Sequence, residues 1–322
     1  MTRTFQHLAL WAFALLSLPM AAGAANEART LNVLFIGNSF TARHNLSTVV
    51  KAMAEAGNPG LTLNRTDVIY GGRTLKDHWR LGTQNIVKQS TLTEAEEKAT
   101  IAALEKDVAA NHKDKYAPSA LARHRDLLPK IEAYRKPWDI IVLQSYRDDI
   151  EGDPTLYAEY APKFAALAKA QGARVILYET TPATQNEKAL TAPPDPAPVL
   201  AKEKAIASLA KKIDASVAPM ALVALRCQTQ RPDLTLRFVN DAHLNQTMAY
   251  LTACTLYAAL FNQSPVGLPI DTVTDIRTQE KPAPDKTKDR DGAPLTRKFS
   301  DQDRADLQRI AWEGWQEFQK LP

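Results

Sequence analysis

The stretch LNVLFIGNS, residues 31–39, decides the fold class of this chain. Its first six residues are apolar except for Asn32, and a short apolar run that ends at a glycine predicts a buried strand. Apolar side chains then recur at helical spacing over residues 45–56, at Leu46, Val49, Val50 and Met53. A strand followed directly by an amphipathic helix is the beginning of a βαβ unit.

Three further apolar runs repeat this pattern. Residues 61–70 predict a second strand, 138–144 (WDIIVLQ) a third and 173–180 (ARVILYET) a fourth, with a helical segment at 157–171 between the last two. Strands that alternate with helices predict a parallel sheet with crossover helices. Parallel strands are buried on both faces, which explains why these runs are almost continuously apolar. We therefore predict an α/β fold with three layers (α/β/α) around a central, mostly parallel sheet.

Three segments interrupt the alternation. Residues 83–136 are charged and rich in helix-favouring residues, which predicts a helical insertion between the second and third strands. Residues 181–198 contain five prolines and predict a loop before a helix at 200–213. The polar residues 279–294 predict an exposed loop.

The two ends of the chain predict different elements. Residues 1–24 contain one Arg, an apolar stretch at 8–18 and then small residues, which is typical of a secretory signal peptide cleaved near Ala24. The apolar stretch covers about 11 residues, fewer than the roughly 20 of a membrane-spanning helix, so an anchor is the less favoured alternative. Residues 300–320 predict a closing helix capped by Ser300. We expect an exported protein, periplasmic or secreted, with no membrane span in the mature chain.

Composition limits the domain organisation and the partners. Of the 322 residues 45% are hydrophobic and 24% charged, as in globular proteins, and we expect residues 25–322 to form one domain. The 40 basic and 36 acidic residues leave a net charge of only +4, which argues against a nucleic-acid partner. Two cysteines are too few for a disulfide framework; in an exported chain Cys227 and Cys254 have two open alternatives, a disulfide or two buried thiols. No His, Asp and Glu residues have metal-ligand spacing, so we predict no metal and no cofactor.

Polar residues and glycines follow the predicted strands. Ser39 comes after the first strand, Gly71-Gly72 after the second and Gln144-Ser145 after the third, and residues 240–243 (NDAH) follow a strand-like run at 234–239. The carboxyl ends of parallel strands meet at one edge of a sheet, where catalytic groups gather. A serine, a histidine as its base and backbone N–H groups that stabilise negative charge are the components of acyl transfer.

Four other histidines have less specific surroundings. His44 follows the serine turn and is expected to be a helix residue and not a rival base. For His78, a pocket position and an interior position are equally open. His112 and His124 lie in charged helical sequence, which predicts solvated side chains.

These residues resemble the ordered sequence blocks of the SGNH (GDSL-like) hydrolase superfamily, over roughly residues 31–265. The GNSFT run is similar to the nucleophile block as found in one branch of that superfamily, and it implies Ser39 as the nucleophile and its N–H as an oxyanion donor. The glycine block implies Gly72 as a second donor. Gln144 stands where the superfamily has an asparagine donor, and the last block implies His243 as the base.

The last block departs from the superfamily at one position. The resemblance places an aspartate three residues before the histidine, where this chain has Asn240, and the nearest carboxylate is that of Asp241, two residues before. An aspartate at this place fixes the imidazole tautomer, and replacing it by an amide slows trypsin by about 10⁴. Asp241 is the favoured orienting residue, and Asn240, through its side-chain oxygen, is the alternative, as is a Ser-His dyad.

The resemblance implies an exported serine esterase that forms an acyl-enzyme intermediate, acting on short-acyl (acetyl) esters of carbohydrate. The alternative is a catalytically weak or inactive exported protein of the same fold that binds carbohydrate or cell-envelope ligands. The two departures, at Asn240 and Gln144, favour that alternative. The only partner we expect is a small-molecule or carbohydrate ester.

Overall fold

The computed structural model describes residues 28–111, 113–144, 146–147, 150, 155–276 and 285–321. The predicted signal peptide at 1–24, together with His112, Ser145 and residues 279–284 of the predicted loop, lies outside the described residues. No helix in the described part of the chain is both long and apolar enough to cross a membrane.

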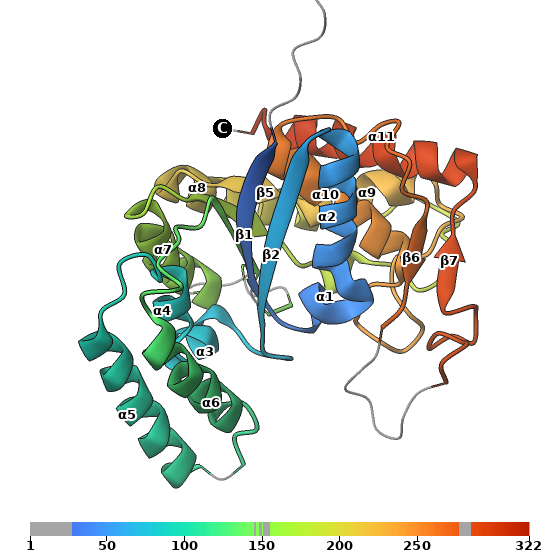
Figure 1. Ribbon diagram of the computed structural model, residues 1–322. Coiled ribbons are helices and arrows are strands. Elements are labelled where there is room, and N and C mark those ends of the chain that lie inside the picture. Colours follow the sequence, from blue (N-terminus) through green and yellow to red (C-terminus); the bar gives the residue numbers. More distant parts are fainter. Residues whose placement is uncertain are drawn as a thin grey trace, which may run out of the picture.

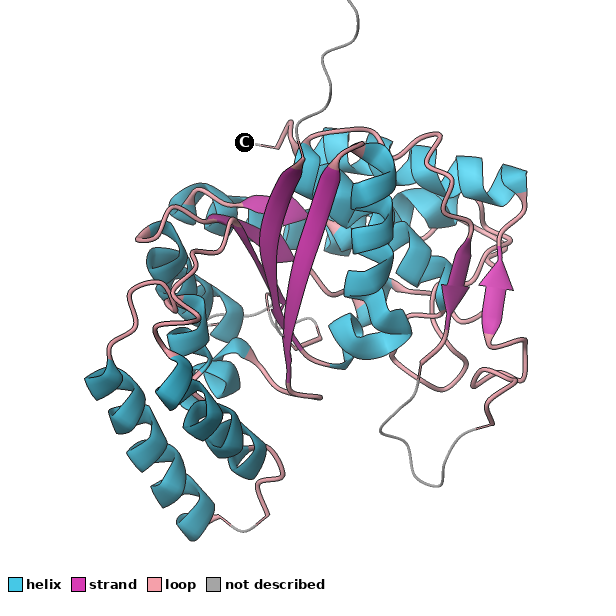
Figure 2. Ribbon diagram, viewed as in Figure 1, coloured by secondary structure: helices cyan, strands magenta, loops and turns pink. Residues whose placement is uncertain are grey.

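Five parallel strands form the centre of the molecule in the order β2-β1-β3-β4-β5 (Figure 1 and Figure 2). The chain passes from β1 to β2 on one side and then to β3 on the other, so the strand order reverses between β1 and β3. Open parallel sheets bind ligands outside the carboxyl ends of the strands at such a point. The predicted α/β class is confirmed, with one more strand than the four predicted: β1 (Arg29–Gly37), β2 (Leu61–Ile69), β3 (Ile140–Gln144), β4 (Arg174–Tyr178) and β5 (Ser216–Ala218).

Successive side chains of β1 enter two different hydrophobic clusters. Val33 and Phe35 pack in one cluster and Leu34 and Ile36 in the other, because neighbouring side chains of a strand point to opposite faces. Helices cover both faces and so make the three layers (Figure 1). The first cluster contains residues of α2 (Leu46–Gly57), α9 (Met220–Gln230), α10 (Gln246–Phe261) and α11 (Asp301–Phe318), and the second contains residues of α3 (Leu75–Arg80), α7 (Leu156–Lys169) and α8 (Ala197–Ile213).

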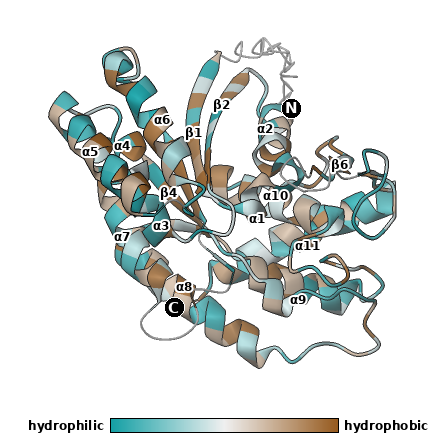
Figure 3. Cartoon of the chain, turned by 90° about the horizontal axis from the view of Figure 1, so that it is seen from below, coloured by the Kyte–Doolittle hydropathy of each residue, from teal (hydrophilic) through white to brown (hydrophobic). Residues whose placement is uncertain are grey.

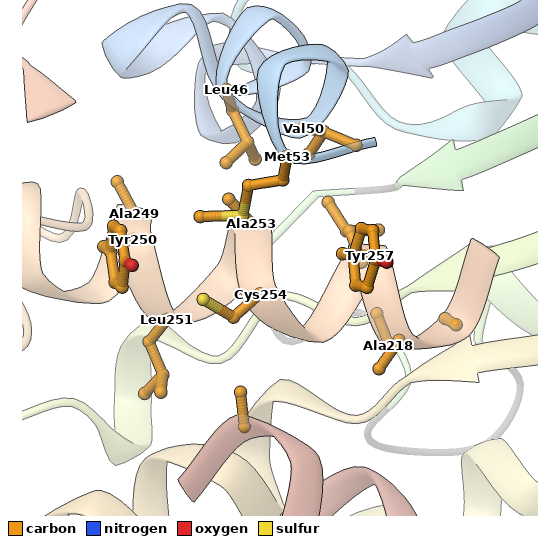
Figure 4. Packing of buried hydrophobic residues seen from close by; sticks show 14 of the residues in the cluster. Leu46, Val50, Met53, Ala218, Ala249, Tyr250, Leu251, Ala253, Cys254 and Tyr257 are labelled. Carbon is orange, nitrogen blue, oxygen red and sulfur yellow. The ribbon is translucent and has the colours of Figure 1, made fainter. Parts of the chain in front are cut away.

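Helix α10 is buried along almost its whole length, from Gln246 to Leu260. Its apolar side chains pack against α2, and Figure 4 shows Ala253 close to Met53. A helix that is apolar on all sides belongs in the interior. Cys254 of α10 and Cys227 of α9 are both buried and both free, so the structure has two thiols and no disulfide between them.

Residues 83–136 form helices that extend away from the sheet (Figure 1). They comprise α4 (Thr83–Val87), α5 (Glu94–Ala110), α6 (Ala117–Leu127) and a 3-10 turn, Leu128–Lys130. The prediction of a solvated His124 was wrong: it is fully buried, with Nδ1 2.7 Å from Glu97 Oε1. The charged sequence suggested exposure, but Glu97 and His124 lie on the faces where α5 and α6 meet and contact each other there.

The remaining elements are short. Helix α11 begins as predicted, with the Ser300 hydroxyl accepting the Asp303 N–H at 3.0 Å. The strand-like run at 234–239 is not a strand: it makes only an isolated bridge, between Arg237 and Leu244, because the chain folds back on itself at Asn240. The other elements are α1 (Ser39–Ala42), two 3-10 turns (Arg43–Asn45 and Pro182–Thr184) and an unpredicted antiparallel pair, β6 (Thr272–Thr274) and β7 (Thr296–Lys298).

Candidate active site

The turn that ends β1 holds Ser39 at the first position of α1. Asn38 caps this helix, its Oδ1 accepting the Phe40 N–H at 3.1 Å. The Asn38 amide also donates to the Arg73 carbonyl at 3.0 Å, which ties the serine turn to the loop after β2. Gly37 is required here, because a Cβ at that position would collide with Thr41 Oγ1 and Gln144 Oε1.

Gln144, the last residue of β3, holds the same turn from the other side. Its Oε1 accepts the Asn38 backbone N–H at 2.8 Å and the Thr41 hydroxyl at 3.1 Å. The backbone N–H is always a donor, so it identifies the facing amide atom as the oxygen. The Gln144 Nε2 is buried and has no hydrogen-bond partner in the described structure. A buried donor without a partner costs free energy, so its presence marks a functional candidate.

His243 connects the serine to a carboxylate. Its Nε2 lies 2.8 Å from Ser39 Oγ, and its Nδ1 lies 2.6 Å from Asp241 Oδ1. The same Asp241 oxygen accepts the backbone N–H of His243 at 3.0 Å. The ring of Phe40 lies against the imidazole, with 5.2 Å between centroids. The backbone contact therefore fixes the carboxylate, and the contacts of the two ring nitrogens with Asp241 and Ser39 fix the position of the imidazole.

The loop around Asn240 explains why a spacing of two residues is sufficient. Asn240 has a φ of +57°, a left-handed conformation that asparagine tolerates better than most residues. This conformation reverses the chain, and Asp241 then accepts from the N–H two residues ahead, as in an Asx turn. Asn240 itself is exposed, and its backbone N–H donates to Glu187 at 3.3 Å. The structure thus brings Asp241, and not the Asn240 side chain, to the histidine.

Two arginines contact the other side of the Asp241 carboxylate. Arg290 forms an ion pair with Oδ2, and Arg43 Nη2 lies 4.0 Å from the same oxygen. Arg43 is buried and also pairs with Asp275 at 3.5 Å. Positive charge beside a carboxylate favours its ionised form, which is the form that accepts a hydrogen bond from the imidazole.

The loop after β2 brings two glycines to the serine. Gly72 has a φ of +69° and leads into the Arg73 carbonyl that Asn38 holds. A left-handed backbone of this kind explains the choice of glycine. The Gly71 carbonyl accepts the Tyr116 hydroxyl at 2.8 Å. Tyr116 belongs to the segment between strands β2 and β3, so the insertion contributes directly to the site.

A cleft of about 310 Å³ opens beside Ser39 and His243. Figure 3 views the molecule from the side on which α1 lies, with α4, α5 and α6 on one side of α1 and α9 and α11 on the other. The described residues that line the cleft are Ser39, Phe40, Ala42, Arg43, Ile69, Gly71, Gly72, Lys115, Tyr116, Tyr146, Arg147, Ala242, His243 and Ile276.

His44 and His78 lie in the interior and not in the cleft. The pKa of each is lowered to about 4, first of all by burial, so both rings are neutral at pH 7. His78 Nε2 lies 2.9 Å from the Gly37 carbonyl, and His44 Nε2 lies 2.9 Å from the Leu244 carbonyl. Both support the backbone on either side of the serine and histidine. Within the described residues there is also no group of three or more metal-ligating side chains.

No family model matches the chain, and none of the curated proteins compared with it matches in sequence. One solved structure does match: a "putative SGNH hydrolase" from Slackia heliotrinireducens. It is 17% identical, it aligns with 72% of this chain and 100% of its own, and the TM-score is 0.43.

Sequence reasoning missed most of the cleft lining. Lys115 and Tyr116 come from the insertion, and Tyr146 and Arg147 come from the loop after β3. Neither pair has a motif of its own. Only their order in the sequence could have indicated them. The two segments come after β2 and after β3, whose carboxyl ends lie next to that of β1.

Proposed function

We propose that this chain is a serine hydrolase that cleaves an ester through an acyl-enzyme intermediate. The observation that carries the proposal is the hydrogen-bonded series from Ser39 Oγ to His243 Nε2, at 2.8 Å, and from His243 Nδ1 to Asp241 Oδ1, at 2.6 Å. A serine hydroxyl is a weak nucleophile until a base takes its proton. Asp241 holds the proton on Nδ1, which leaves the Nε2 lone pair free for that purpose.

The reaction then follows in two halves. Ser39 Oγ attacks the ester carbonyl while its proton passes to His243 Nε2, and the imidazolium returns that proton to the departing alcohol. Water next attacks the acyl-Ser39 ester, again losing a proton to His243, and the acid leaves as Ser39 recovers its hydrogen. The Asp241 carboxylate stabilises the imidazolium in both halves. The same carboxylate also contacts Arg290 and Arg43.

Three donors are proposed to hold the oxyanion. The Ser39 N–H is at the start of α1, where no acceptor exists within the helix. Gly72 lines the cleft together with Ser39, and Asn38 ties the Gly72 loop to the serine turn. Gln144 supplies its Nε2, the buried donor without a partner. Removal of one donor of this type costs about 10²–10³ in kcat.

Short acyl groups, with acetyl esters of carbohydrate first among them, are the proposed substrates. A cleft of about 310 Å³ is at the small end of the range for ligand sites, which suits a small acyl group more than a long chain.

We further propose that residues 1–24 are removed on export. A secreted or periplasmic product that begins near Ala25 in N-terminal sequencing is the expected result, and an intact amino terminus would contradict it.

The test compares the mature protein with Ser39→Ala on p-nitrophenyl acetate and on a fluorophosphonate probe. Turnover and covalent labelling are expected for the parent and absent from the variant, while Ser264→Ala, at an exposed serine outside the cleft, behaves as the parent. Labelling that survives in Ser39→Ala, or no turnover in the parent, would overturn the proposal and leave a binding protein as the better description. Acetate release from a panel of acetylated polysaccharides tests the substrate class.

A further inference from the structure

Cationic side chains gather on the described lining of the cleft beside Ser39. Three cationic side chains, Arg43, Lys115 and Arg147, are among the described residues that line it, and no Asp or Glu is among them. A concave surface lined by one sign of charge concentrates ligands of the opposite sign.

Two of these cations are available to a ligand. Arg43 is buried, and its charge is matched by Asp275 and Asp241. Lys115 and Arg147 are exposed, and no carboxylate of the described chain lies within 4.0 Å of either. They reach the cleft from different elements, Lys115 from the insertion and Arg147 from the loop after β3.

A tyrosine next in sequence lies under each cation. The Lys115 ammonium is 4.9 Å from the centre of the Tyr116 ring, and the Arg147 guanidinium is 5.2 Å from that of Tyr146. Both tyrosines line the cleft. Contact with a ring face weakly stabilises a cation and restricts where it lies, so each charge is held at the cleft and not dispersed in solvent.

Arg73 increases the local charge. Its guanidinium lies 5.2 Å from the same Tyr116 ring that Lys115 contacts, and its buried Nε has no hydrogen-bond partner in the described structure. Two like charges on one ring repel each other, and an anion between or beside them would offset that repulsion. The Tyr116 hydroxyl donates to the Gly71 carbonyl, so this charge is held next to the glycines that line the cleft with Ser39.

We propose that the natural substrate is an anionic ester, whose alcohol portion carries a carboxylate, sulfate or phosphate that Lys115 and Arg147 bind while the acyl carbonyl lies at Ser39. The proposal rests on the proposed hydrolase function and specifies its substrate class. The anion is assigned to the alcohol portion because both cations are exposed, whereas Ser39 is half-buried within the cleft. An acidic saccharide that bears an acetyl ester has this chemistry.

The test compares an anionic acetyl ester, 4-acetoxybenzoate, with its neutral analogue, 4-acetoxybenzamide. Two further anionic acetyl esters, 4-acetoxybenzenesulfonate and 4-acetoxyphenyl phosphate, distinguish which anion is preferred. The measured quantity is the ratio of kcat/KM for the anionic ester to that for the neutral ester, at low and high NaCl. Lys115→Gln and Arg147→Gln are each expected to lower this ratio about threefold, and the double variant about tenfold, as expected for exposed ion pairs. Added salt should lower the parent ratio toward that of the double variant.

The control variant is Lys113→Gln, which removes an exposed lysine two residues away that does not line the cleft. It should leave the ratio unchanged, and Lys115→Arg should retain the parent ratio. Ser39-dependent hydrolysis with a ratio that neither the variants nor salt change would overturn the anionic substrate while leaving the hydrolase intact.

A binding measurement separates the two proposals if no ester is hydrolysed. Isothermal titration calorimetry of trigalacturonate into Ser39→Ala should give binding that maltotriose, its neutral counterpart, lacks. The triple variant Ser39→Ala/Lys115→Gln/Arg147→Gln should bind trigalacturonate about tenfold more weakly. Equal binding of the charged and neutral sugars, or equal affinity of the two variants, would overturn the anionic site.

Discussion

A single oxygen of Asp241 accepts two N–H groups of the same residue. The backbone N–H of His243 lies 3.0 Å from Oδ1, and the ring Nδ1 lies 2.6 Å from it. The first contact fixes the carboxylate relative to the chain, and the second fixes the ring relative to the carboxylate. Asn240 contributes a left-handed backbone, which makes this short loop possible.

Asp241→Asn should lower kcat by about 10⁴, because an amide in place of the carboxylate favours the wrong imidazole tautomer. Asn240→Gly keeps the positive φ and removes only the side-chain amide, so its kcat should stay within about tenfold of the parent. The measurement is the initial rate on p-nitrophenyl acetate, with circular dichroism to confirm folding. A larger loss in Asn240→Gly than in Asp241→Asn would show that Asn240 orients the histidine.

Gln144 has two tasks that one substitution can separate. Gln144→Glu keeps an oxygen for the Asn38 N–H and the Thr41 hydroxyl but removes the Nε2 donor. We expect kcat to fall by about 10² with a folded protein, because one oxyanion donor is lost. Gln144→Ala should in addition lower the free energy of unfolding by about 1–3 kcal/mol, since it leaves the Asn38 N–H buried without a partner. A Gln144→Glu variant with parent kcat would limit Gln144 to a structural role.

At the scale of the elements, strands were easier to predict than the loops that bear the site. The apolar runs that became β1 to β4 need burial on both faces, and that requirement is visible in composition alone. The run at 234–239 (LTLRFV) is also strand-like in sequence, but Asn240 reverses the chain, and the backbone N–H groups of Leu236 and Arg237 donate to Asn186 and not to a strand. β5 has three residues, too few for a pattern to show.

The same limit applies to the candidate site. Ser39 and His243 lie 204 residues apart, and no local pattern measures the distance between them. They were predicted because each follows a strand or ends a sequence block of a familiar kind. Lys115 and Arg147 were not predicted, because their place in the cleft depends on how the insertion and the β3 loop fold over the sheet.

The insertion depends on the buried contact between α5 and α6. His124→Ala removes the hydrogen-bond partner of Glu97 Oε1, and we expect the insertion to lose about 3 kcal/mol of local stability, as when a buried polar group loses its partner. Amide hydrogen exchange in α5 and α6 should then rise about 100-fold, with little change in β1 and β3. Arg125→Ala is the matched control, because Arg125 is exposed and pairs with Glu105 at the surface. Equal exchange in the two variants would contradict a structural role for the pair.

For the whole molecule, two buried histidines link stability to pH on both sides of the site. His78 supports the Gly37 carbonyl beneath the serine turn, and His44 supports the Leu244 carbonyl after His243. Burial lowers the pKa of each from 6.5 to about 4, so both are neutral in the folded chain where they would be partly charged in the unfolded chain. The unfolded state therefore binds more protons between these values.

Stability should therefore rise with pH between about 4 and 6.5, and this gain is complete above the unfolded pKa and lost as the pH falls. Each histidine contributes up to about 3 kcal/mol over that interval, because folding lowers its pKa from 6.5 to about 4. Urea unfolding at pH 7.0, 6.0, 5.0 and 4.5 measures the slope of the unfolding free energy against pH. In His78→Gln the amide can still donate to the Gly37 carbonyl, and the slope should correspond to about one proton fewer taken up on unfolding. A variant slope equal to that of the parent would mean that His78 is protonated in the folded chain and that its neutral ring does not hold the serine turn.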